Sequence, residues 1–238
     1  MGDKNVAIIT ARGGSKRIPK KNIKDFCGKP IIAYSIQAAL ESNLFEEVMV
    51  STDSEEIAEI AKSYGAKVPF MRSEKTSNDF AGTADVLMEV LGKYAELGEQ
   101  FQYMCCLYPT APFVTPEKLV KAMNMLKEKR AKVVMTVVPF SYPPQRCFVI
   151  DEDSNMKYKF EQYKLSRSQD LEKFYHDAGQ FYFYDAKKFV DLQGKIYSEI
   201  CPVVVSELEV QDIDDFTDWK IAEMKYQLMV ENMSGNDL

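Results

Sequence analysis

The sequence predicts a three-layer α/β fold in which helices cover both faces of a mostly parallel sheet. Strand-like and helix-like segments alternate over the first 140 of the 238 residues, which is typical of right-handed β-α-β units. The strand-like segments are short apolar runs such as Val6–Thr10, whereas apolar residues in Pro30–Ser42 recur at helical spacing. A basic loop containing Gly13 and Gly14 follows the first run, where α/β proteins commonly bind phosphates.

Sequence signals place each element in turn. Pro30 suits the first turn of a helix, Asp53 and Ser54 can cap the helix after them, and Thr115 opens another. The expected strands are Val6–Thr10, Val48–Thr52, Lys67–Phe70, Met104–Tyr108 and Val133–Val138. The expected helices are Pro30–Ser42, Asp53–Tyr64, Phe80–Leu97 and Thr115–Lys129.

The regular alternation stops after Pro139. Residues 139–175 are punctuated by prolines and rich in aromatic residues, which indicates an inserted arm rather than an independent domain. Residues 1–238 are therefore expected to form a single domain with an inserted arm. The remaining expected elements are strands at Gln180–Tyr184 and Pro202–Val205, a helix at Phe216–Met229 and a frayed tail at Ser234–Leu238.

The loop after the first strand is strongly basic. From Arg12 to Lys29 it carries seven cations against one anion, Asp25. Gly13 and Gly14 allow backbone amides to approach an oxyanion without a Cβ in the way. The loop has the spacing of neither a Walker A motif nor a dinucleotide-binding GxGxxG motif. A solvated basic loop is the alternative, but a polyphosphate ligand explains why an acidic protein concentrates positive charge here.

The composition excludes several classes of protein. The net charge of −6 argues against a general nucleic-acid binder, and no apolar run reaches the length of a membrane span. The five cysteines form no CxxC pair, and reduced thiols without a signal peptide predict a cytoplasmic protein. Cys105 and Cys106 are expected in the core, and Phe181–Tyr184 is expected to pack on alternate faces of a sheet.

A second charge cluster, of opposite sign, lies near the C-terminus. Six carboxylates occur within residues 207–218. In an extended segment Asp212 and Asp214 project to the same face, with Ile213 packed behind them. Two carboxylates beside a triphosphate provide hard oxygen ligands for Mg²⁺. The alternative is that an aspartate only caps the last helix, and Asp215 is the expected cap.

Five segments together resemble the family of cytidylyltransferases that make CMP-sugar acids. The basic loop resembles that family's phosphate and cytidine loop, and the Asp-x-Asp segment resembles its metal-binding pair. The likeness extends from about residue 5 to residue 230 and so covers the whole chain. The segments are Ala11–Asn22, Val50–Asp53, Arg72 with Ser77–Asp79, Tyr108–Pro112 and Asp212–Asp214.

The resemblance implies a Rossmann-like nucleotidyltransferase fold, CTP and a sugar acid as substrates, Mg²⁺ as cofactor and a homodimer formed through the arm. The implied catalytic residues are Arg12 and Lys21 for the phosphates and Asp212 and Asp214 for the metal. The implied nucleotide-binding residues are Ala11, Arg12, Gly13, Gly14, Ser15, Lys21, Asn22, Arg72, Ala81, Gly82 and Thr83. The implied sugar-binding residues are Tyr108, Thr110, Arg167, Gln180 and Phe181.

Departures from the family pattern indicate the sugar. Sialic acid enzymes carry Gln where this chain has Tyr108, and Tyr175–Tyr182 resembles the pseudaminic acid cytidylyltransferases. A nonulosonic acid, preferably pseudaminic acid, is therefore the expected acceptor. The alternatives within the same reaction class are sialic, legionaminic and 3-deoxy-manno-octulosonic acid.

Two other functions fit the residues less well. An enzyme acting on a sugar 1-phosphate usually has a Gly-x-Gly-(Thr/Ser)-Arg-Leu loop, which Arg12–Arg17 does not match. A non-catalytic nucleotide-binding protein is expected to lose the aspartate pair, and both Asp212 and Asp214 are present. The single histidine, His176, is expected to be structural rather than catalytic.

Overall fold

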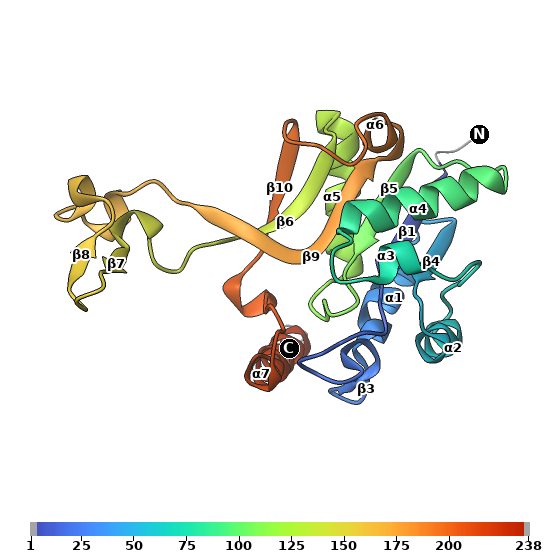
Figure 1. Cartoon of the computed structure of the whole chain (residues 1–238), viewed down its shortest axis with the longest axis horizontal. Helices are drawn as coiled ribbons and strands as arrows, with labels where there is room; N and C mark the ends of the chain where they lie inside the picture. The colour runs from blue at the N-terminus through green and yellow to red at the C-terminus, as the bar shows by residue number, and fades with distance from the viewer. Residues whose placement is uncertain (1–3, 236–238) are drawn as a thin grey trace.

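The computed structural model describes residues 4–235 and consists of a six-stranded sheet with helices on both faces (Figure 1). The strands are β1 (Asn5–Thr10), β2 (Asp25–Phe26), β3 (Lys29–Pro30), β4 (Glu47–Ser51), β5 (Tyr103–Leu107), β6 (Val133–Pro139), β7 (Phe148–Ile150), β8 (Met156–Tyr158), β9 (Tyr175–Asp185) and β10 (Ile200–Val204). The helices are α1 (Ile31–Glu41), α2 (Glu55–Ser63), α3 (Glu74–Ser77), α4 (Thr83–Glu96), α5 (Pro116–Lys129), α6 (Ala186–Asp191) and α7 (Phe216–Gly235).

The sheet is mixed but mostly parallel, in the order β10-β6-β9-β5-β1-β4. β1 pairs in parallel with β4 and β5, and β10 pairs in parallel with β6. Only β9 runs antiparallel, between β5 and β6. The α/β prediction is therefore confirmed, with one strand whose direction the sequence did not define. Because β1 and β5 are parallel neighbours, the loops that follow them meet at one edge of the sheet.

Two apolar cores separate the three layers. One core joins α1 and α5 to the sheet and contains Ile9 and Leu119. The other joins α4 and α6 to the opposite face and contains Ile8, Leu87 and Phe189. Adjacent strand residues point to opposite faces, so Ile8 and Ile9 belong to different cores.

The same alternation governs the neighbouring strands. Cys105 and Cys106 are fully buried in opposite cores, as expected of free thiols that act as small apolar residues. Phe181 and Phe183 of β9 lie in the first core, and Tyr182 packs against the second. The expected alternate-face packing of these aromatic residues is confirmed.

A third core attaches α7 to the basic loop and the start of α1. Phe26 and Trp219 meet edge to face with their ring centroids 5.5 Å apart, and Ile18 and Tyr34 complete the group. Ile213 is buried in this core, which holds the backbone of the Asp-x-Asp segment in place. The cores thus bring the N-terminal loop and the C-terminal acidic segment together, although they are about 190 residues apart in sequence.

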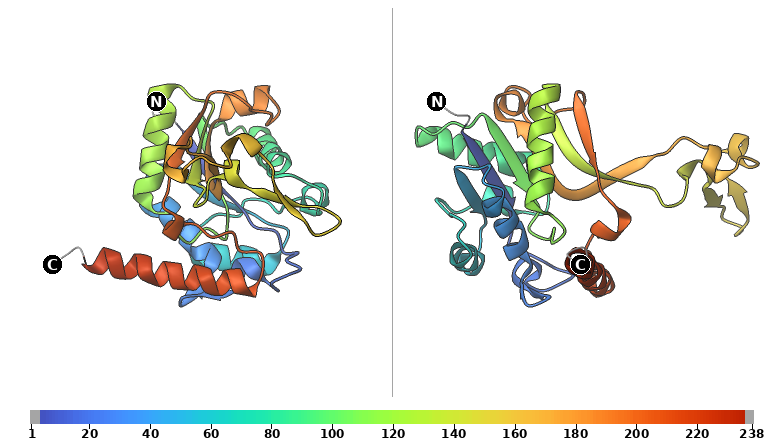
Figure 2. Two further views of the ribbon diagram at one scale, coloured as in Figure 1. Left: turned by 90° about the vertical axis from the view of Figure 1, so that its left-hand side faces the viewer. Right: turned by 180° about the vertical axis from the view of Figure 1, so that it is seen from behind.

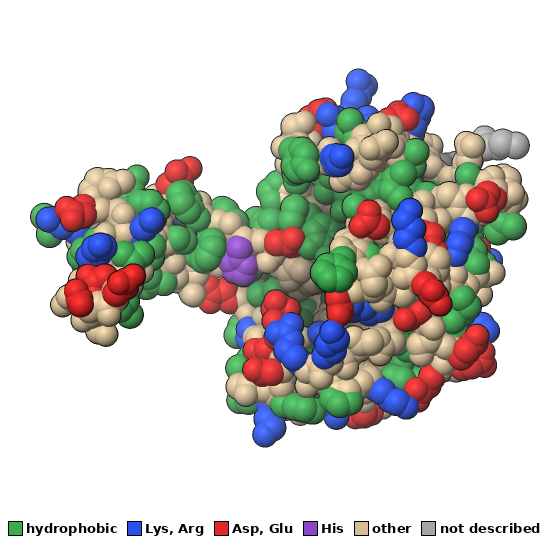
Figure 3. All heavy atoms as spheres, in the orientation of Figure 1, with side chains coloured by type: hydrophobic (Ala, Val, Ile, Leu, Met, Phe, Trp, Pro, Cys, Tyr) green, Lys and Arg blue, Asp and Glu red, His purple; other side chains and the backbone are tan. Residues whose placement is uncertain are grey.

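Residues 140–174 leave the body between β6 and β9 and form an arm that projects from it (Figures 1 and 2). The pairing of β6 with β9 continues to Pro139 opposite Tyr175, so the base of the arm is a continuation of the main sheet. The arm ends in the hairpin β7-β8. Figure 3 shows apolar side chains gathered along the arm and its junction with the body. Phe148, Ile150 and Leu165 are among its exposed apolar side chains.

Two predicted elements differ in the structure. The sequence predicts a strand over Lys67–Phe70, but only Lys67 pairs, with Met49, because Pro69 has no N–H to donate to a ladder. The helix predicted from Phe80 begins at Thr83 instead. Asn78 causes this delay, since its Oδ1 accepts hydrogen bonds from the N–H groups of residues 80 and 81 and holds them in a turn.

Other differences concern the short helices and the C-terminus. The sequence signals did not predict α3 and α6, which are only four and six residues long. α7 continues to Gly235, beyond its expected end, and the last part of the expected frayed tail, residues 236–238, lies outside the described residues. No helix within residues 4–235 combines the length and apolar character that crossing a bilayer requires.

Candidate active site

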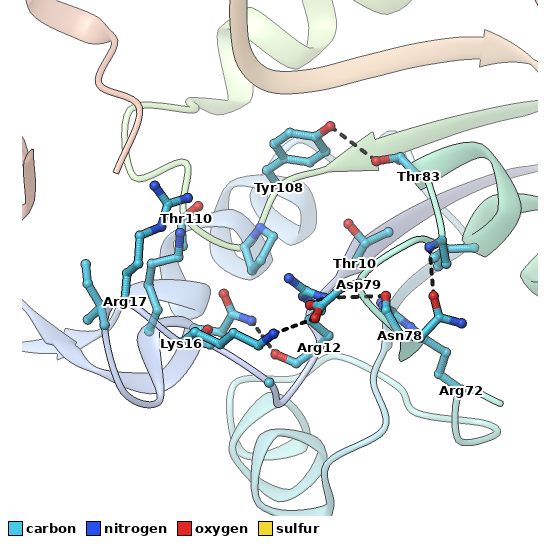
Figure 4. Close-up of a pocket in the computed structure, with 18 of the residues that line it drawn as sticks. Thr10, Arg12, Lys16, Arg17, Arg72, Asn78, Asp79, Thr83, Tyr108 and Thr110 are labelled. Atoms are coloured by element: carbon cyan, nitrogen blue, oxygen red, sulfur yellow. Dashed lines mark hydrogen bonds and ion pairs between the residues drawn. The ribbon is translucent and has the colours of Figure 1, made fainter. Parts of the chain in front are cut away.

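A cavity of about 630 Å³ opens at the carboxyl ends of β1 and β5 (Figure 4). The basic loop forms one wall, the start of α4 forms another, and the residues after β5 form a third. Asp214 reaches this first cavity from the C-terminal segment. The predicted residues that line it are Arg12, Gly14, Ser15, Lys21, Asn22, Arg72, Ala81, Thr83, Tyr108, Thr110 and Asp214.

The first cavity is strongly cationic. Five cations and two carboxylates line it, which leaves an excess of three positive charges. The cations are Arg12, Lys16, Arg17, Lys21 and Arg72, and the carboxylates are Asp79 and Asp214. A cleft of one charge sign concentrates ligands of the opposite sign, so this cavity is suited to a polyphosphate.

The carboxylates currently pair with cations of the basic loop. Asp79 bridges two of them, with 2.7 Å from its Oδ1 to Nη1 of Arg12 and 2.6 Å from its Oδ2 to Nζ of Lys16. These hydrogen bonds, led by that of Lys16, hold the pKa of Asp79 below its ordinary value. Asp214 pairs with Arg17 at 2.7 Å. All of these side chains are substantially exposed, so a phosphate can replace the carboxylates at small cost.

Lys21 connects the basic loop to the acidic segment. Its Nζ donates a hydrogen bond to the carbonyl of Ile213 at 2.7 Å, between the two aspartates. Burial lowers the pKa of Lys21, and Asp214 and Asp212 partly oppose this shift. Asn22 stabilises the loop itself, because its Nδ2 donates to the carbonyl of Arg12 at 2.8 Å.

Arg72 bonds to the end of β4, and Gly13 joins the basic loop to the start of α2. Arg72 is buried, and its guanidinium donates to Oγ and to the carbonyl oxygen of Ser51 at 3.0 and 2.6 Å. Burial lowers the pKa of Arg72, and Asp53 is the main opposing charge. The N–H of Gly13 donates to Asp53, and a Cβ on Gly13 would lie 3.1 Å from that of Ser54. Glycine is therefore favoured at position 13 by close packing.

Three predicted nucleotide-binding residues do not line the first cavity. Ala11 is fully buried and its N–H donates to the carbonyl of Ser51. Gly13 uses its N–H on Asp53, and Gly82 precedes the first residue of α4, with its own N–H bonded to Asp85. The hydrogen bonds of these three residues stabilise the loops. Their direct contact with a nucleotide stays a prediction.

A second cavity, of about 650 Å³, lies at the base of the arm. Tyr108 and Thr110 line both cavities, so they form the shared wall. Asp212 lines the second cavity, whereas Asp214 lines the first. The Asp-x-Asp segment therefore runs along the junction between the two cavities.

Three predicted sugar-binding residues line neither of the two cavities. Phe181 is fully buried in the main core and reaches neither cavity, because it alternates with Tyr182 along β9. Gln180 is buried too, and its Nε2 donates to the carbonyl of Glu209. Arg167 belongs to the projecting arm, where it pairs with Asp170 at 2.8 Å. It lines neither cavity of its own chain.

Comparison with known proteins defines the family. The family model described as Cytidylyltransferase matches residues 6–230. The chain belongs to the cytidylyltransferase family. A pseudaminic acid cytidylyltransferase of Campylobacter jejuni is 41% identical over 96% of this chain and 99% of its own length. A CMP-N,N'-diacetyllegionaminic acid synthase of Legionella pneumophila is 35% identical over 95% of this chain and 97% of its own.

The solved structures agree on the fold of this cytidylyltransferase. A CMP:2-keto-3-deoxy-manno-octonic acid synthetase complexed with CTP superposes with a TM-score of 0.69 at 20% identity. That comparison covers 96% of this chain and 99% of the other. A 4-diphosphocytidyl-2C-methyl-D-erythritol synthase from Anaerococcus prevotii gives a TM-score of 0.62 at 17% identity. At these identities the likeness concerns the fold alone.

The donor set of the cytidylyltransferase suits Mg²⁺ held jointly with a ligand. Asp212 and Asp214 offer hard oxygen ligands at the junction of the cavities. Within residues 4–235 no cluster of three or more His, Cys, Asp or Glu side chains could hold a metal. Further coordination positions would therefore be left to phosphate oxygens and water. Asp215, as predicted, caps α7 instead, accepting from the N–H groups of Thr217 and Asp218 at 2.7 and 3.1 Å.

Sequence reasoning missed several residues that line the cavities. Asp79 was part of a recognised segment, but its pairing with the basic loop depends on tertiary structure. In the second cavity, Asp177, Tyr182 and Lys225 were not predicted. His176, expected to be structural, lies at the edge of that cavity with its ring 4.8 Å from that of Phe140. The segment Tyr175–Tyr182 was the available signal, since it contains three of these four residues.

Proposed function

We propose that this enzyme transfers the cytidylyl group of CTP to the anomeric hydroxyl of a nonulosonic acid, with pseudaminic acid preferred. The products are the CMP-sugar and pyrophosphate. The observation that carries the proposal is the junction of the two cavities. A cationic cavity suited to a triphosphate shares the wall of Tyr108 and Thr110 with a second cavity large enough for a sugar acid.

The reaction is an in-line displacement at the α-phosphorus, which requires alignment and charge neutralisation more than covalent catalysis. Arg12 would bridge the α-phosphate and the leaving group, and Lys21 would bind the β- and γ-phosphates. Ser15 and the amides of the glycine loop would add hydrogen-bond donors. Their interactions strengthen as negative charge develops on the departing pyrophosphate, so they act mainly on the transition state.

Asp212 and Asp214 would hold Mg²⁺. When bound, the ion would neutralise charge on phosphate oxygens. The aspartates suit this role because Ile213 between them is buried and Lys21 bonds to its carbonyl, which holds the pair beside the phosphate loop.

Cytosine would be recognised at the other end of the first cavity. Asn22, Arg72 and the Ala81–Thr83 segment are the proposed contacts, with backbone and side-chain groups matched to the carbonyl and amino groups of the base. Ala81 and Thr83 line the cavity beside Arg72, which supports this placement. The five free cysteines support a reducing compartment, and we propose that the enzyme works in the cytoplasm, where CTP is available.

The charge of the second cavity supports a homodimer. Three carboxylates and one lysine line it, so its own charged residues would repel an anionic sugar acid. These charged residues are Asp177, Glu207, Asp212 and Lys225. Arg167 belongs to the projecting arm and does not line this cavity, and its guanidinium suits a carboxylate. We therefore propose that the arm docks on a second copy of the chain and that Arg167 binds the sugar carboxylate there.

Mixing two inactive variants tests this arrangement. Asp214→Asn and Arg167→Ala are each expected to be nearly inactive at low sugar concentration, but their mixture should recover activity. In a mixed dimer, one of the two sites then has both residues intact. If subunits exchange at random, about a quarter of the wild-type rate should return. The measurement is pyrophosphate release after the two proteins have been unfolded and refolded together.

Each variant refolded alone provides the control. If Arg167 acted within its own chain, a mixed dimer would contain two defective sites and the mixture would stay inactive. That result, or a monomer by light scattering, would contradict the shared site.

The choice of sugar gives a further prediction. With Tyr108 where sialic acid enzymes have Gln, the site lacks the side-chain amide at this position that could pair with the glycerol hydroxyls of N-acetylneuraminic acid. Burying two of these hydroxyls unpaired, at about 1–3 kcal/mol each, should lower kcat/KM about a hundredfold relative to pseudaminic acid. Pyrophosphate release with each acid under the same CTP and Mg²⁺ measures the ratio. Equal or better use of N-acetylneuraminic acid would move the enzyme to the sialic acid branch.

A further inference from the structure

An irregularity in β9 places Asp177 and Tyr182 side by side. In a regular strand, residues five apart lie on opposite faces and about 16 Å apart. Here the pairing with β6 shifts register, so that Met135 lies opposite Tyr182 while Val137 lies opposite Asp177. Gly179, with a φ of +60°, provides the left-handed turn inside this bulge. As a result, Tyr182 Oη reaches Asp177 Oδ2 at 2.7 Å.

The carboxylate of Asp177 is held from two sides. Its Oδ1 accepts the N–H of Gly179 at 2.8 Å, and its Oδ2 accepts the hydroxyl of Tyr182. Tyr182 is in turn packed against Tyr108, with ring centroids 5.5 Å apart, and Tyr108 Oη lies 3.3 Å from Thr83 Oγ1 at the start of α4. This chain of contacts runs from Thr83, which lines the first cavity, to Asp177, which lines the second. The position of the Asp177 carboxylate therefore depends on residues of both cavities.

Two bonds do not saturate a carboxylate, which has about four acceptor positions. Asp177 is exposed and lines the second cavity, so its free positions are available to a ligand. An ionised carboxylate accepts hydrogen bonds and cannot donate them, and it repels the acid group of the substrate. The ligand group beside it must therefore be an N–H or an O–H, remote from the substrate carboxylate.

The wall next to Asp177 favours an amide over a hydroxyl. Val138, Pro139 and Phe140 line the same cavity from β6 and the base of the arm. Val137 and Val138 pair with Asp177 and His176, so this apolar wall is adjacent to the carboxylate. An acylamino group combines an N–H donor with an apolar acyl end. The Asp177 carboxylate can accept the N–H, and the apolar wall can pack against the acyl end.

We propose that Asp177 is a specificity-determining residue that accepts the N–H of an acylamino group of the sugar acid, with the acyl end against Val138 and Phe140. This inference rests on the proposed function and names the substrate feature that its second cavity selects. Tyr182 positions the Asp177 carboxylate through the hydrogen bond from its hydroxyl.

Asp177→Ala tests the proposal with two sugar acids. For pseudaminic acid, which has acylamino groups, kcat/KM should fall about tenfold to a hundredfold, mainly through KM for the sugar. The KM for CTP should change less than about twofold. For 3-deoxy-manno-octulosonic acid, which has no amide, used as a substrate or competitive inhibitor, the variant should behave as the wild type does.

Tyr182→Phe is the matched variant, because it keeps the ring packed and removes only the hydroxyl that holds Asp177. Its loss of kcat/KM for pseudaminic acid should be about a third to a tenth of the loss in Asp177→Ala, again without an effect on 3-deoxy-manno-octulosonic acid. This variant remains informative if Asp177→Ala fails to fold. A parallel loss with both sugars, or an equal rise in KM for CTP, would overturn the assignment of Asp177. If the wild type uses no nonulosonic acid at all, the proposed function fails, and this inference with it.

Discussion

Replacing Arg12 with alanine is expected to lower kcat about a hundredfold while the fold is retained. Arg12 lies in the first cavity on an exposed loop, and its present partners are Asp79 and the carbonyl of Asn78, so little packing is lost. Its proposed contribution is to the charge that develops between the α-phosphate and pyrophosphate. Because that charge is largest in the transition state, kcat should fall more than the affinity for CTP. Single-turnover rates together with CTP titration measure the two effects separately.

Lys16→Ala is the matched control for Arg12→Ala. Lys16 lines the same cavity and pairs with the same Asp79 carboxylate, so both variants lose an equivalent exposed ion pair. We expect Lys16→Ala to cost only about threefold to tenfold, mostly in KM for CTP. Near-normal turnover of Arg12→Ala, or equal losses in the two variants, would contradict the role assigned to Arg12.

Asp214→Asn is expected to lower Mg²⁺-dependent activity about a thousandfold or more. Asparagine keeps the size of the side chain and removes the charge that would hold the metal. CTP binding should fall less, because the cations of the basic loop are unchanged. The variant also loses its ion pair with Arg17, but that pair is exposed and contributes little. Pyrophosphate release over a Mg²⁺ titration, compared with CTP binding, measures the difference.

The neighbouring aspartate provides an unusually close control. Asp215 caps α7, and asparagine is an equally good N-cap, so Asp215→Asn should keep the thermal midpoint and most of the activity. Wild-type activity of Asp214→Asn would show that Asp214 does not hold the metal. Equal damage from both substitutions would show that the segment matters for structure alone.

Much of the candidate site could be predicted from sequence because its signals are local. The basic loop is a continuous run of residues, and its position after a buried strand follows from the period of apolar residues. Asp212, Ile213 and Asp214 are adjacent in sequence, and the burial of Ile213 between two polar neighbours follows from their alternation. These features depend on a few consecutive residues and are present in the structure, except that Asp212 and Asp214 line different cavities rather than one cleft.

Sequence alone could not show on which face of the sheet a residue would lie or which neighbours it would meet. Phe181 lies within a recognised segment, but the direction of β9 and its pairing with β5 and β6 turn that side chain into the core. Gln180 is buried too, and its side-chain amide donates to the backbone carbonyl of Glu209. Arg167 belongs to the arm and lines neither of the two cavities of its own chain.

The sequence by itself determined the α/β class, the basic character of the first loop and the Asp-x-Asp segment, because each is encoded by neighbouring residues. Tertiary structure alone decided that Lys21 meets the carbonyl of Ile213, 192 positions away, and that two cavities share one wall. It also decided the contact between Asp177 and Tyr182, which depends on a bulge at Gly179. Contacts of this kind are set by strand order and register, and these result from packing the whole chain into one set of cores.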